Sequence, residues 1–419
     1  MSSKLEFLEG CAPATREIHL PIVGLAHGGK LNPAGLGYPE LLGAGSQLLG
    51  QSSVGFESAA AYHHADNLPS LWGKEYGVVG TEESVALARE VNRLYLGNGA
   101  IITPSGLAAI NVALGTLLSR RPDRDVSILV PEHIYSPVWR LLTRGAYSEA
   151  DQIYTYGCSE GSFDSAVRKA IEKGKPPAIV YIESPVSNRF EVHDLEFLVS
   201  RAKSLGATTV IDNTNNSFIG CQPIRDFDVD VVVEAGTKYM GGYADCPFGL
   251  TVCKSDSLAE EIAYFGRVHG ACTLAPGIAL LAQHRIPSTS ERMQRSYQNA
   301  AELRRQVFEP MREQGLIDRI LYYDPLTSGS EATRKQYTRG NGLTTVIFTA
   351  GVTDAQRNRF LDESPLVVPA ASWGGHVTVA TVMEIDRKPA TRVHTGLETA
   401  EDLVRGFRLG AKQAFGFEA

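Results

Sequence analysis

The sequence has few cysteines and no long apolar run. Its 419 residues include six cysteines, Cys11, Cys158, Cys221, Cys246, Cys253 and Cys272, without the paired spacing of a metal site. We therefore expect a reduced, cytoplasmic protein without a metal ion. No apolar stretch reaches the length of a membrane span, and the first ten residues are polar and carry acids. We expect neither a membrane anchor nor a signal peptide.

The sequence also lacks an excess of positive charge. Its formal net charge is −7 and it has no basic run, so we expect no binding to nucleic acid or to an anionic membrane. Hydrophobic residues make up 43% and charged residues 21%, which is ordinary for a globular enzyme. Because 419 residues are too many for one ordinary core, we expect two domains plus an arm.

Residues 1–75 are rich in glycine, serine and alanine and have little periodicity. The glycines between Gly43 and Gly55 suggest a phosphate loop, but no apolar strand precedes them and no GKS/T ending follows. A flexible N-terminal arm that makes oligomer contacts is the favoured interpretation. The first helical pattern, from Thr81 to Asn92, has apolar residues at Val85, Leu87, Ala88 and Val91.

After this helix, short apolar strands alternate with helical segments. The predicted strands are Val126–Val130, Ala178–Ile182, Thr208–Ile211, Val229–Val233 and Leu250–Val252. This alternation predicts an α/β domain over residues 76–275, with a mainly parallel sheet covered by helices on both faces. Ligands of such sheets bind at the carboxyl ends of the strands, where Tyr135, Glu183, Asp212 and Lys238 fall.

The pattern changes near Gly270–Pro276, and residues 276–419 are predicted to form a smaller α+β domain. Glu291–Gly315 has the pattern of one long amphipathic helix, and Glu398–Phe415 that of a closing helix. Leu343–Thr349 and His376–Val382 are predicted strands.

Lys238 is the most informative residue. It follows the apolar stretch Val229–Val233 and precedes a glycine-rich turn. An amine held there is desolvated, which lowers its pKa and leaves a nucleophile for a carbonyl. The natural carbonyl partner is pyridoxal 5′-phosphate (PLP), which a lysine holds as a Schiff base. On its own, the run is equally compatible with a structural lysine.

Two further segments support a PLP site. Asp212 ends the apolar strand Thr208–Ile211, where an unpaired carboxylate would be costly. A PLP enzyme needs an acid opposite the pyridine nitrogen, because the protonated ring is the electron sink; a turn cap is the alternative. Ser105 and Gly106 open a helix whose free N–H groups suit a phosphate, although Ser105 alone would be a simple N-cap.

With the segment Tyr181–Asp194 (YIESPVSNRFEVHD), these motifs resemble the PLP-dependent enzymes of cysteine and methionine metabolism, the cystathionine synthases and lyases. The resemblance runs from about Tyr76 to the C-terminus, and Ser372–Gly375 with Arg392–Glu398 is most similar to cystathionine β-lyase. It implies fold type I of the PLP-dependent transferases, with a mainly parallel seven-stranded sheet domain and a smaller α+β domain. It also implies a homotetramer, built from dimers that share their active sites.

The resemblance implies roles for individual residues. Catalysis would use Lys238, Tyr135 and Tyr76, with Tyr135 stacked on the cofactor ring and Tyr76 reaching the neighbouring subunit's phosphate. The cofactor phosphate would be bound by Ser105, Gly106, Leu107 and Thr237. Arg392 would bind the substrate α-carboxylate bidentately, with Ser372 and Trp373 on the same side. Alone, each tyrosine would be a packed aromatic and Arg392 a surface ion pair.

The chain departs from the β-lyase pattern where the far end of cystathionine would bind. Val78 and Val79 replace two arginines, and Arg140 replaces an acid. The distal amino group and carboxylate of cystathionine need charged partners, and each buried pair left unpaired costs roughly 2–5 kcal/mol. We therefore expect a smaller, less polar amino acid with a thiol, ester or halide leaving group. Lys74 is near enough in sequence to replace the lost phosphate partner.

These features predict β-elimination from a small amino acid that is not cystathionine. The alternative is γ-elimination or γ-replacement on a γ-substituted amino acid, including a halogenated one, in a specialised pathway that gives an unsaturated product. A non-catalytic PLP-fold protein is disfavoured because Lys238 and Asp212 are both present. The motif set also argues against an aminotransferase.

Overall fold

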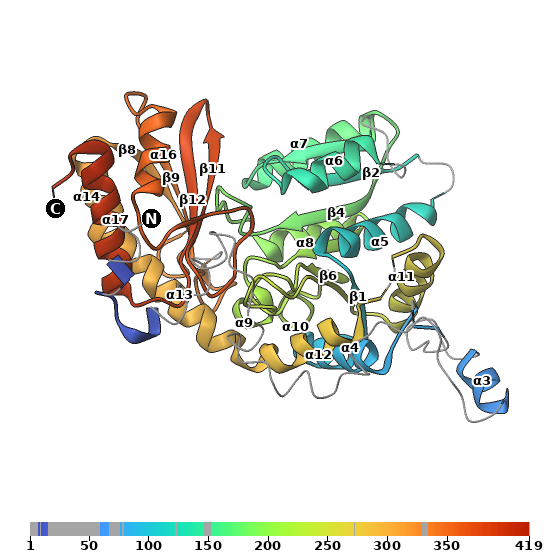
Figure 1. Ribbon diagram of the computed structural model, residues 1–419. Helices are drawn as coiled ribbons and strands as arrows, with labels where there is room; N and C mark the ends of the chain where they lie inside the picture. Colours follow the sequence, from blue (N-terminus) through green and yellow to red (C-terminus); the bar gives the residue numbers. More distant parts are fainter. Residues whose placement is uncertain are drawn as a thin grey trace.

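The computed structural model describes residues 7–8, 10–15, 59–66, 76–77, 79–121, 125–145, 152–271, 273–328 and 334–418. These residues form a larger lobe around a seven-stranded sheet and a smaller lobe around a five-stranded sheet (Figure 1). In the described part of the chain, no helix is both long and apolar enough to cross a membrane.

The large sheet has the strand order β1-β7-β6-β5-β4-β2-β3. Its strands are β1 (Gly99–Thr103), β2 (Ser127–Pro131), β3 (Ile153–Tyr156), β4 (Pro177–Glu183), β5 (Thr208–Asp212), β6 (Val231–Glu234) and β7 (Gly249–Cys253). Strand β7 is antiparallel to both of its neighbours, and the pairs from β6 to β3 are all parallel. The prediction of a mainly parallel seven-stranded sheet is confirmed.

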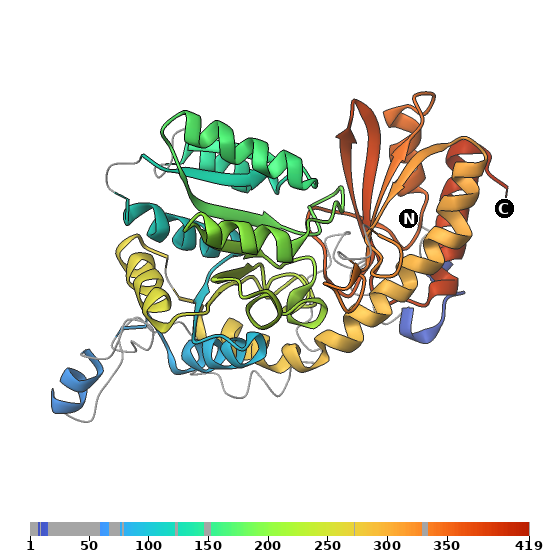
Figure 2. The ribbon, with the colours of Figure 1, turned by 180° about the vertical axis from the view of Figure 1, so that it is seen from behind.

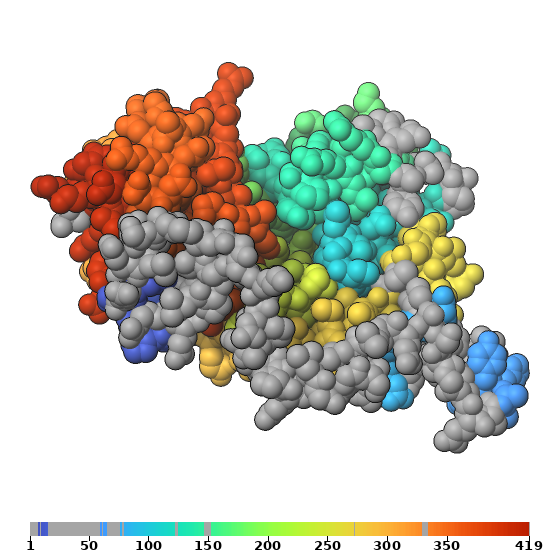
Figure 3. Space-filling view, in the orientation of Figure 1, coloured from blue at the N-terminus to red at the C-terminus, as the bar shows by residue number. Residues whose placement is uncertain are grey.

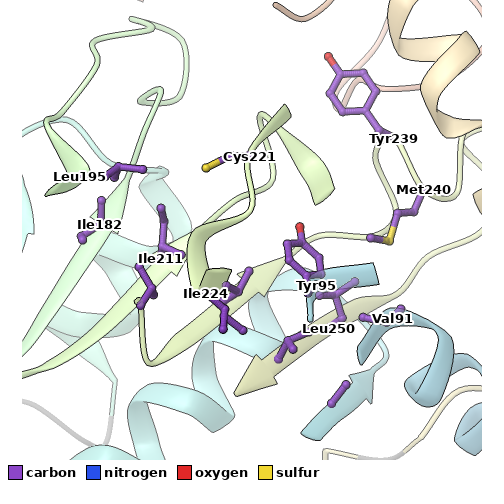
Figure 4. Packing of buried hydrophobic residues seen from close by; sticks show 14 of the residues in the cluster. Val91, Tyr95, Ile182, Leu195, Ile211, Cys221, Ile224, Tyr239, Met240 and Leu250 are labelled. Atoms are coloured by element: carbon purple, nitrogen blue, oxygen red, sulfur yellow. The ribbon is translucent and has the colours of Figure 1, made fainter. Parts of the chain in front are cut away.

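Helices cover both faces of this sheet because its buried side chains alternate between two cores. Leu129 faces one core, whereas its neighbours Ile128 and Val130 face the other. The first core contains residues of α4 (Glu82–Tyr95), α7 (Glu160–Glu172), α8 (Leu195–Ser204), α10 (Pro223–Phe227) and α12 (Pro276–Arg285), and Figure 4 shows part of it. The second contains residues of α5 (Gly106–Ser119), α6 (Ser136–Arg144) and α11 (Asp256–Val268).

The small sheet has the strand order β10-β11-β12-β9-β8. Its strands are β8 (Ile317–Leu321), β9 (Leu343–Phe348), β10 (Val368–Pro369), β11 (Val379–Ile385) and β12 (Lys388–His394). Its core also contains residues of α13 (Thr289–Leu303), the π-helix Arg304–Phe308, α14 (Glu309–Glu313), α16 (Asp354–Asp362) and α17 (Ala400–Phe415). Figure 2 shows α12 and α13 running from the large lobe to the small one.

The predicted long helix is confirmed as the continuous run from Thr289 to Glu313, and the closing helix as α17. The strand expected at His376–Val382 instead spans Val379–Ile385, where pairing with β12 holds it. Strands β3, β8, β10 and β12 were not predicted. Strands β8 and β12 mix charged residues with apolar ones, and β3 and β10 have only four and two residues. Only pairing with neighbouring strands defines them as strands.

Most of the expected arm, residues 1–75, lies outside the described residues. Its described parts are residues 7–8 and 10–15 and the short helix α3 (Ala59–Asp66). Leu8 is buried in the core of the small lobe, and the backbone N–H of Ala12 donates to Asp402 of α17 at 2.9 Å. The two ends of the chain therefore pack together.

Candidate active site

A cavity of about 340 Å³ lies at the carboxyl ends of the strands of the large sheet. The large lobe contributes residues from α5 and from the ends of β4, β5 and β6, and the small lobe contributes Ala371, Ser372, Trp373 and Arg392. The space-filling view shows the two lobes separated by a hollow along their upper edge (Figure 3). The cavity thus combines residues from the middle and the end of the chain.

Lys238 lies in the turn after β6, and its side chain points into the cavity. Its Nζ donates to Ser372 Oγ at 2.5 Å and lies 5.3 Å from the centre of the Trp373 ring. Burial lowers the pKa of Lys238 to about 8; the charge of Arg392 adds to this effect and that of Asp212 opposes it. More of the amine is therefore unprotonated near neutral pH than in an ordinary lysine, and the unprotonated form is the nucleophile.

The segment that carries Ser372 packs tightly on the backbone of Lys238. Ser372 has a φ of +84°, which is strained for a residue with a side chain. Gly374 has a φ of +86°, and a Cβ there would lie 2.7 Å from the carbonyl carbon of Lys238. Only glycine allows this approach.

Asp212 ends β5 and is almost fully buried. It accepts hydrogen bonds from Thr214 N at 3.0 Å, from Thr214 Oγ1 at 2.5 Å and from Tyr181 Oη at 3.3 Å. Burial raises the pKa of Asp212, while the Thr214 and Tyr181 hydrogen bonds and the charge of Lys238 oppose the rise. A protonated ring nitrogen placed against this carboxylate would favour its charged form.

Glu183 ends the neighbouring strand β4 and faces the same cavity. Its two oxygens accept from the backbone N–H groups of Tyr135, at 2.8 Å, and Ser187, at 2.7 Å. Burial, with the charge of Asp212, raises the pKa of Glu183 to about 8. Glu183 therefore fixes the backbone of Tyr135, whose half-exposed side chain lines the cavity.

Arg392 comes from β12 and has neutral hydrogen-bond partners. It donates to Asn188 Oδ1 at 2.8 Å, to the Ser372 carbonyl at 3.2 Å and to Thr381 Oγ1 at 3.3 Å. Burial lowers the pKa of Arg392 to about 10, so it remains a cation at neutral pH. Its charge is available to a ligand carboxylate.

The N-terminus of α5 forms another wall of the cavity through Ser105, Gly106 and Leu107. Ser105 Oγ caps the helix by accepting from Ala108 N at 3.2 Å, and the first N–H groups of a helix have no acceptor within it. A Cβ at Gly106 would lie 2.5 Å from Ala235 Cβ, so this glycine permits the helix to approach the Lys238 turn. Thr237 lines the cavity, but its hydroxyl donates to the Phe248 carbonyl at 3.0 Å.

Three other residues singled out in the sequence, Tyr76, Val79 and Arg140, do not line this cavity. Tyr76 is 47% exposed, and Val79 contributes to a separate cavity of about 140 Å³ beside β1 and α11. Arg140 is exposed on α6. Val78 and Lys74 lie outside the described residues.

The structure adds site residues that were not expected from the sequence. Ser187, Thr214 and Asn215 line the cavity, and Asn188 contacts Arg392. Thr214 and Asn215 closely follow Asp212, which was the available signal. In the described residues, no group of three or more His, Cys, Asp or Glu side chains could hold a metal ion.

The groups in the cavity fit PLP. A buried amine can hold its aldehyde, a buried acid can face its ring nitrogen, and a helix N-terminus can bind its phosphate. The fold and the site therefore define a PLP-dependent α/β enzyme.

Comparison with known proteins identifies the family. The family model described as Cys/Met metabolism PLP-dependent enzyme matches residues 46–411, and the chain belongs to this family. PLP is its cofactor, and the related enzymes are lyases and synthases that act on carbon–sulfur bonds.

Individual relatives carry several activities. Cystathionine beta-lyase MetC of Escherichia coli is 24% identical over 86% of this chain and 91% of its own length. Cystathionine gamma-lyase of Bacillus subtilis is 26% identical over 79% of this chain and 87% of its own length. The structure of cystathionine gamma synthase from Xanthomonas oryzae pv. oryzae, in complex with aminoacrylate and cysteine, covers 88% of this chain and 93% of its own, with a TM-score of 0.73 and 22% identity. That similarity supports the fold.

Proposed function

We propose that this protein is a lyase that eliminates a β-substituent from a small amino acid and does not use cystathionine. One observation carries the proposal. Among the described residues that line the cavity, the charged ones are Glu183, Asp212, Lys238 and Arg392. Lys238, Asp212 and Arg392 have tasks at the reacting end of the substrate or at the cofactor, and the oxygens of Glu183 accept from the backbone of Tyr135 and Ser187. The leaving group therefore faces neutral side chains.

The neutral part of the lining consists of short polar and apolar groups, Leu107, Ile110, Ser187, Thr214, Asn215, Ala371 and Trp373 among them. The distal amino group and carboxylate of cystathionine would have no countercharge there, at a cost of roughly 2–5 kcal/mol for each group. A thiol, an ester or a halide needs no such partner. The neutral lining of the cavity is the evidence for this specificity. The replacement of an acid by Arg140 is weaker support, because the Arg140 side chain is exposed on α6.

The site residues act on the substrate as follows. Arg392 binds the α-carboxylate and so orients the bond from the α-carbon to its hydrogen. Lys238 Nζ removes the α-proton, with Ser372 Oγ holding the amine in place at 2.5 Å. PLP, when bound, supplies the electron sink for this deprotonation. Asp212 would hold the cofactor at its pyridine nitrogen, Tyr135 would cover the ring and assist proton transfer, and the first turn of α5 would bind the phosphate together with Thr237.

The assembly belongs to the proposal as well. We expect a cytoplasmic homotetramer, in which Tyr76 reaches the phosphate of the neighbouring subunit. The half-exposed side chain of Tyr76, outside the cavity of its own chain, supports this arrangement.

Product analysis by mass spectrometry in deuterated water tests the reaction. Cystathionine, cysteine, O-acetylhomoserine and a γ-halogenated amino acid are offered separately, and the K238A variant serves as the control. Pyruvate from cysteine but not from cystathionine is the expected result. Efficient turnover of cystathionine would contradict the proposed specificity, and deuterium at Cβ of a product from a γ-substituted substrate would establish γ-elimination instead.

A further inference from the structure

Glu234 is a buried acid to which the mechanism above gives no role. It is the last residue of β6 and is 1% exposed. It lies beside the end of β5, which carries Asp212, and begins the turn that leads to Lys238. Its position therefore connects it to both residues proposed to hold the cofactor.

A chain of hydrogen bonds runs from Glu234 toward Asp212. Tyr95, the fully buried last residue of α4, donates its hydroxyl proton to Glu234 Oε2. Tyr95 Oη in turn accepts from Asn213 Nδ2 at 3.0 Å, and Asn213 directly follows Asp212.

A second chain passes through the backbone of the next residue. Ala235 N donates to Thr214 Oγ1 at 2.9 Å, and Thr214 Oγ1 donates to Asp212 Oδ1 at 2.5 Å. The carbonyl of Ala235 accepts from Lys238 N at 3.0 Å. A change at Glu234 therefore acts on the ends of β5 and β6 together.

The groups around Glu234 do not offset a negative charge. Tyr95 faces it from α4, and Ser217 faces it from the short helix α9 (Ser217–Gly220). Asp212 lies on β5, and the residue paired with Glu234 on β7 is the apolar Leu250. Burial raises the pKa of Glu234 to about 8; the Tyr95 and Ser217 hydroxyls oppose this rise and the charge of Asp212 adds to it. An acid in such surroundings destabilises a fold compared with an apolar residue.

We propose that Glu234 is a second acid of the cofactor site, a positioning residue that acts on the pyridine nitrogen of PLP through Asp212. With its proton bound, Glu234 holds the ends of α4, β5 and β6 together through Tyr95 and Asn213. When it releases its proton to solvent, a second negative charge stands behind Asp212 and strengthens the binding of the proton on the pyridine nitrogen. This inference rests on the proposed function, in which Asp212 faces that nitrogen.

Nitrogen-15 NMR of holoenzyme loaded with PLP labelled at the pyridine nitrogen tests the proposal. As the pH rises the nitrogen loses its proton, and in the wild type this is expected at a higher pH than in E234Q, because Glu234, once ionised near pH 8, places a second negative charge behind Asp212. The E234Q variant keeps the shape of the side chain but carries no charge. In Y95F, a hydrogen bond that stabilises the ionised carboxylate is lost, so the midpoint is expected to lie between those of the wild type and E234Q.

The E183Q variant is the matched control, because the pKa of Glu183 is also raised to about 8. The difference between the wild type and E234Q must persist when both proteins also carry E183Q. A wild-type titration retained unchanged in E234Q would overturn the inference. If D212N and K238A also left the signal unchanged, the proposed placement of the cofactor would be wrong as well, so the two failures can be told apart.

Discussion

Lys238 of the large lobe and Ser372 of the small lobe are joined by a hydrogen bond of 2.5 Å between Nζ and Oγ. The same serine accepts from Arg392 through its backbone carbonyl at 3.2 Å. Ser372, whose backbone is strained, thus links Lys238, the proposed nucleophile, to Arg392, the proposed carboxylate-binding group.

Replacement of Lys238 by alanine is expected to abolish the visible absorbance of lysine-bound PLP. It should also slow turnover on the order of 10²–10⁴-fold, because the proposed base is removed. Absorbance spectroscopy and steady-state kinetics measure both effects. K254A is the control, since Lys254 is a half-exposed lysine paired with Asp228 outside the cavity; an absorbance loss in both variants would argue against a specific role for Lys238.

The R392K variant is expected to weaken amino-acid binding by roughly 10–100-fold, because a bidentate charged contact becomes a single one. Binding of the corresponding amine, which lacks the carboxylate, should not change. Spectroscopic titration of the holoenzyme with both ligands measures the difference. Equal weakening for the two ligands would show that the substitution acts on the structure of the site.

The rate at which cofactor-free protein incorporates PLP should rise with pH and level off above about pH 8, the pKa to which burial lowers Lys238. The sign follows because only the neutral amine attacks the aldehyde. In D212N, the curve should move to lower pH, since the anion that raises this pKa is gone. Stopped-flow absorbance measures the rate, and a flat profile between pH 6 and 8 would contradict the assignment.

The G106A variant is expected to lose roughly 1–3 kcal/mol of stability through overpacking, because its Cβ would meet Ala235 Cβ at 2.5 Å. G161A is the matched control, because a Cβ at Gly161 in α7 meets no atom within 4 Å. Denaturant unfolding followed by circular dichroism measures both. A fully stable G106A protein would show that α5 can move away from the Lys238 turn.

Much of the fold was predictable because local patterns and burial agree. The strands that end at Glu183, Asp212 and Glu234 are buried and mainly apolar before their terminal acids, and such runs are typical of a parallel sheet covered on both faces. Strand β12 escaped prediction because its charged residues obscure the pattern. Its position depends on pairing with β9 and β11, which no local window contains.

The candidate site was predictable only in part. The strand-end positions of Lys238 and Asp212 follow from the sequence, and the structure brings both into one cavity. We expected Arg140 to replace an acid that binds the distal end of the substrate. The cavity gives no support for this expectation, because the Arg140 side chain is exposed on α6. A position in the chain does not determine the direction of a side chain.

The sequence by itself determined the order of the strands along the chain and the acid and the amine at their ends, because hydrophobic periodicity is a local property. The tertiary structure decided which distant residues meet. Ser372 reaches Lys238, Glu183 holds the backbone of Tyr135, and Tyr95 donates to Glu234. These contacts join residues far apart in sequence, and they form only when the strand ends and the two lobes pack together.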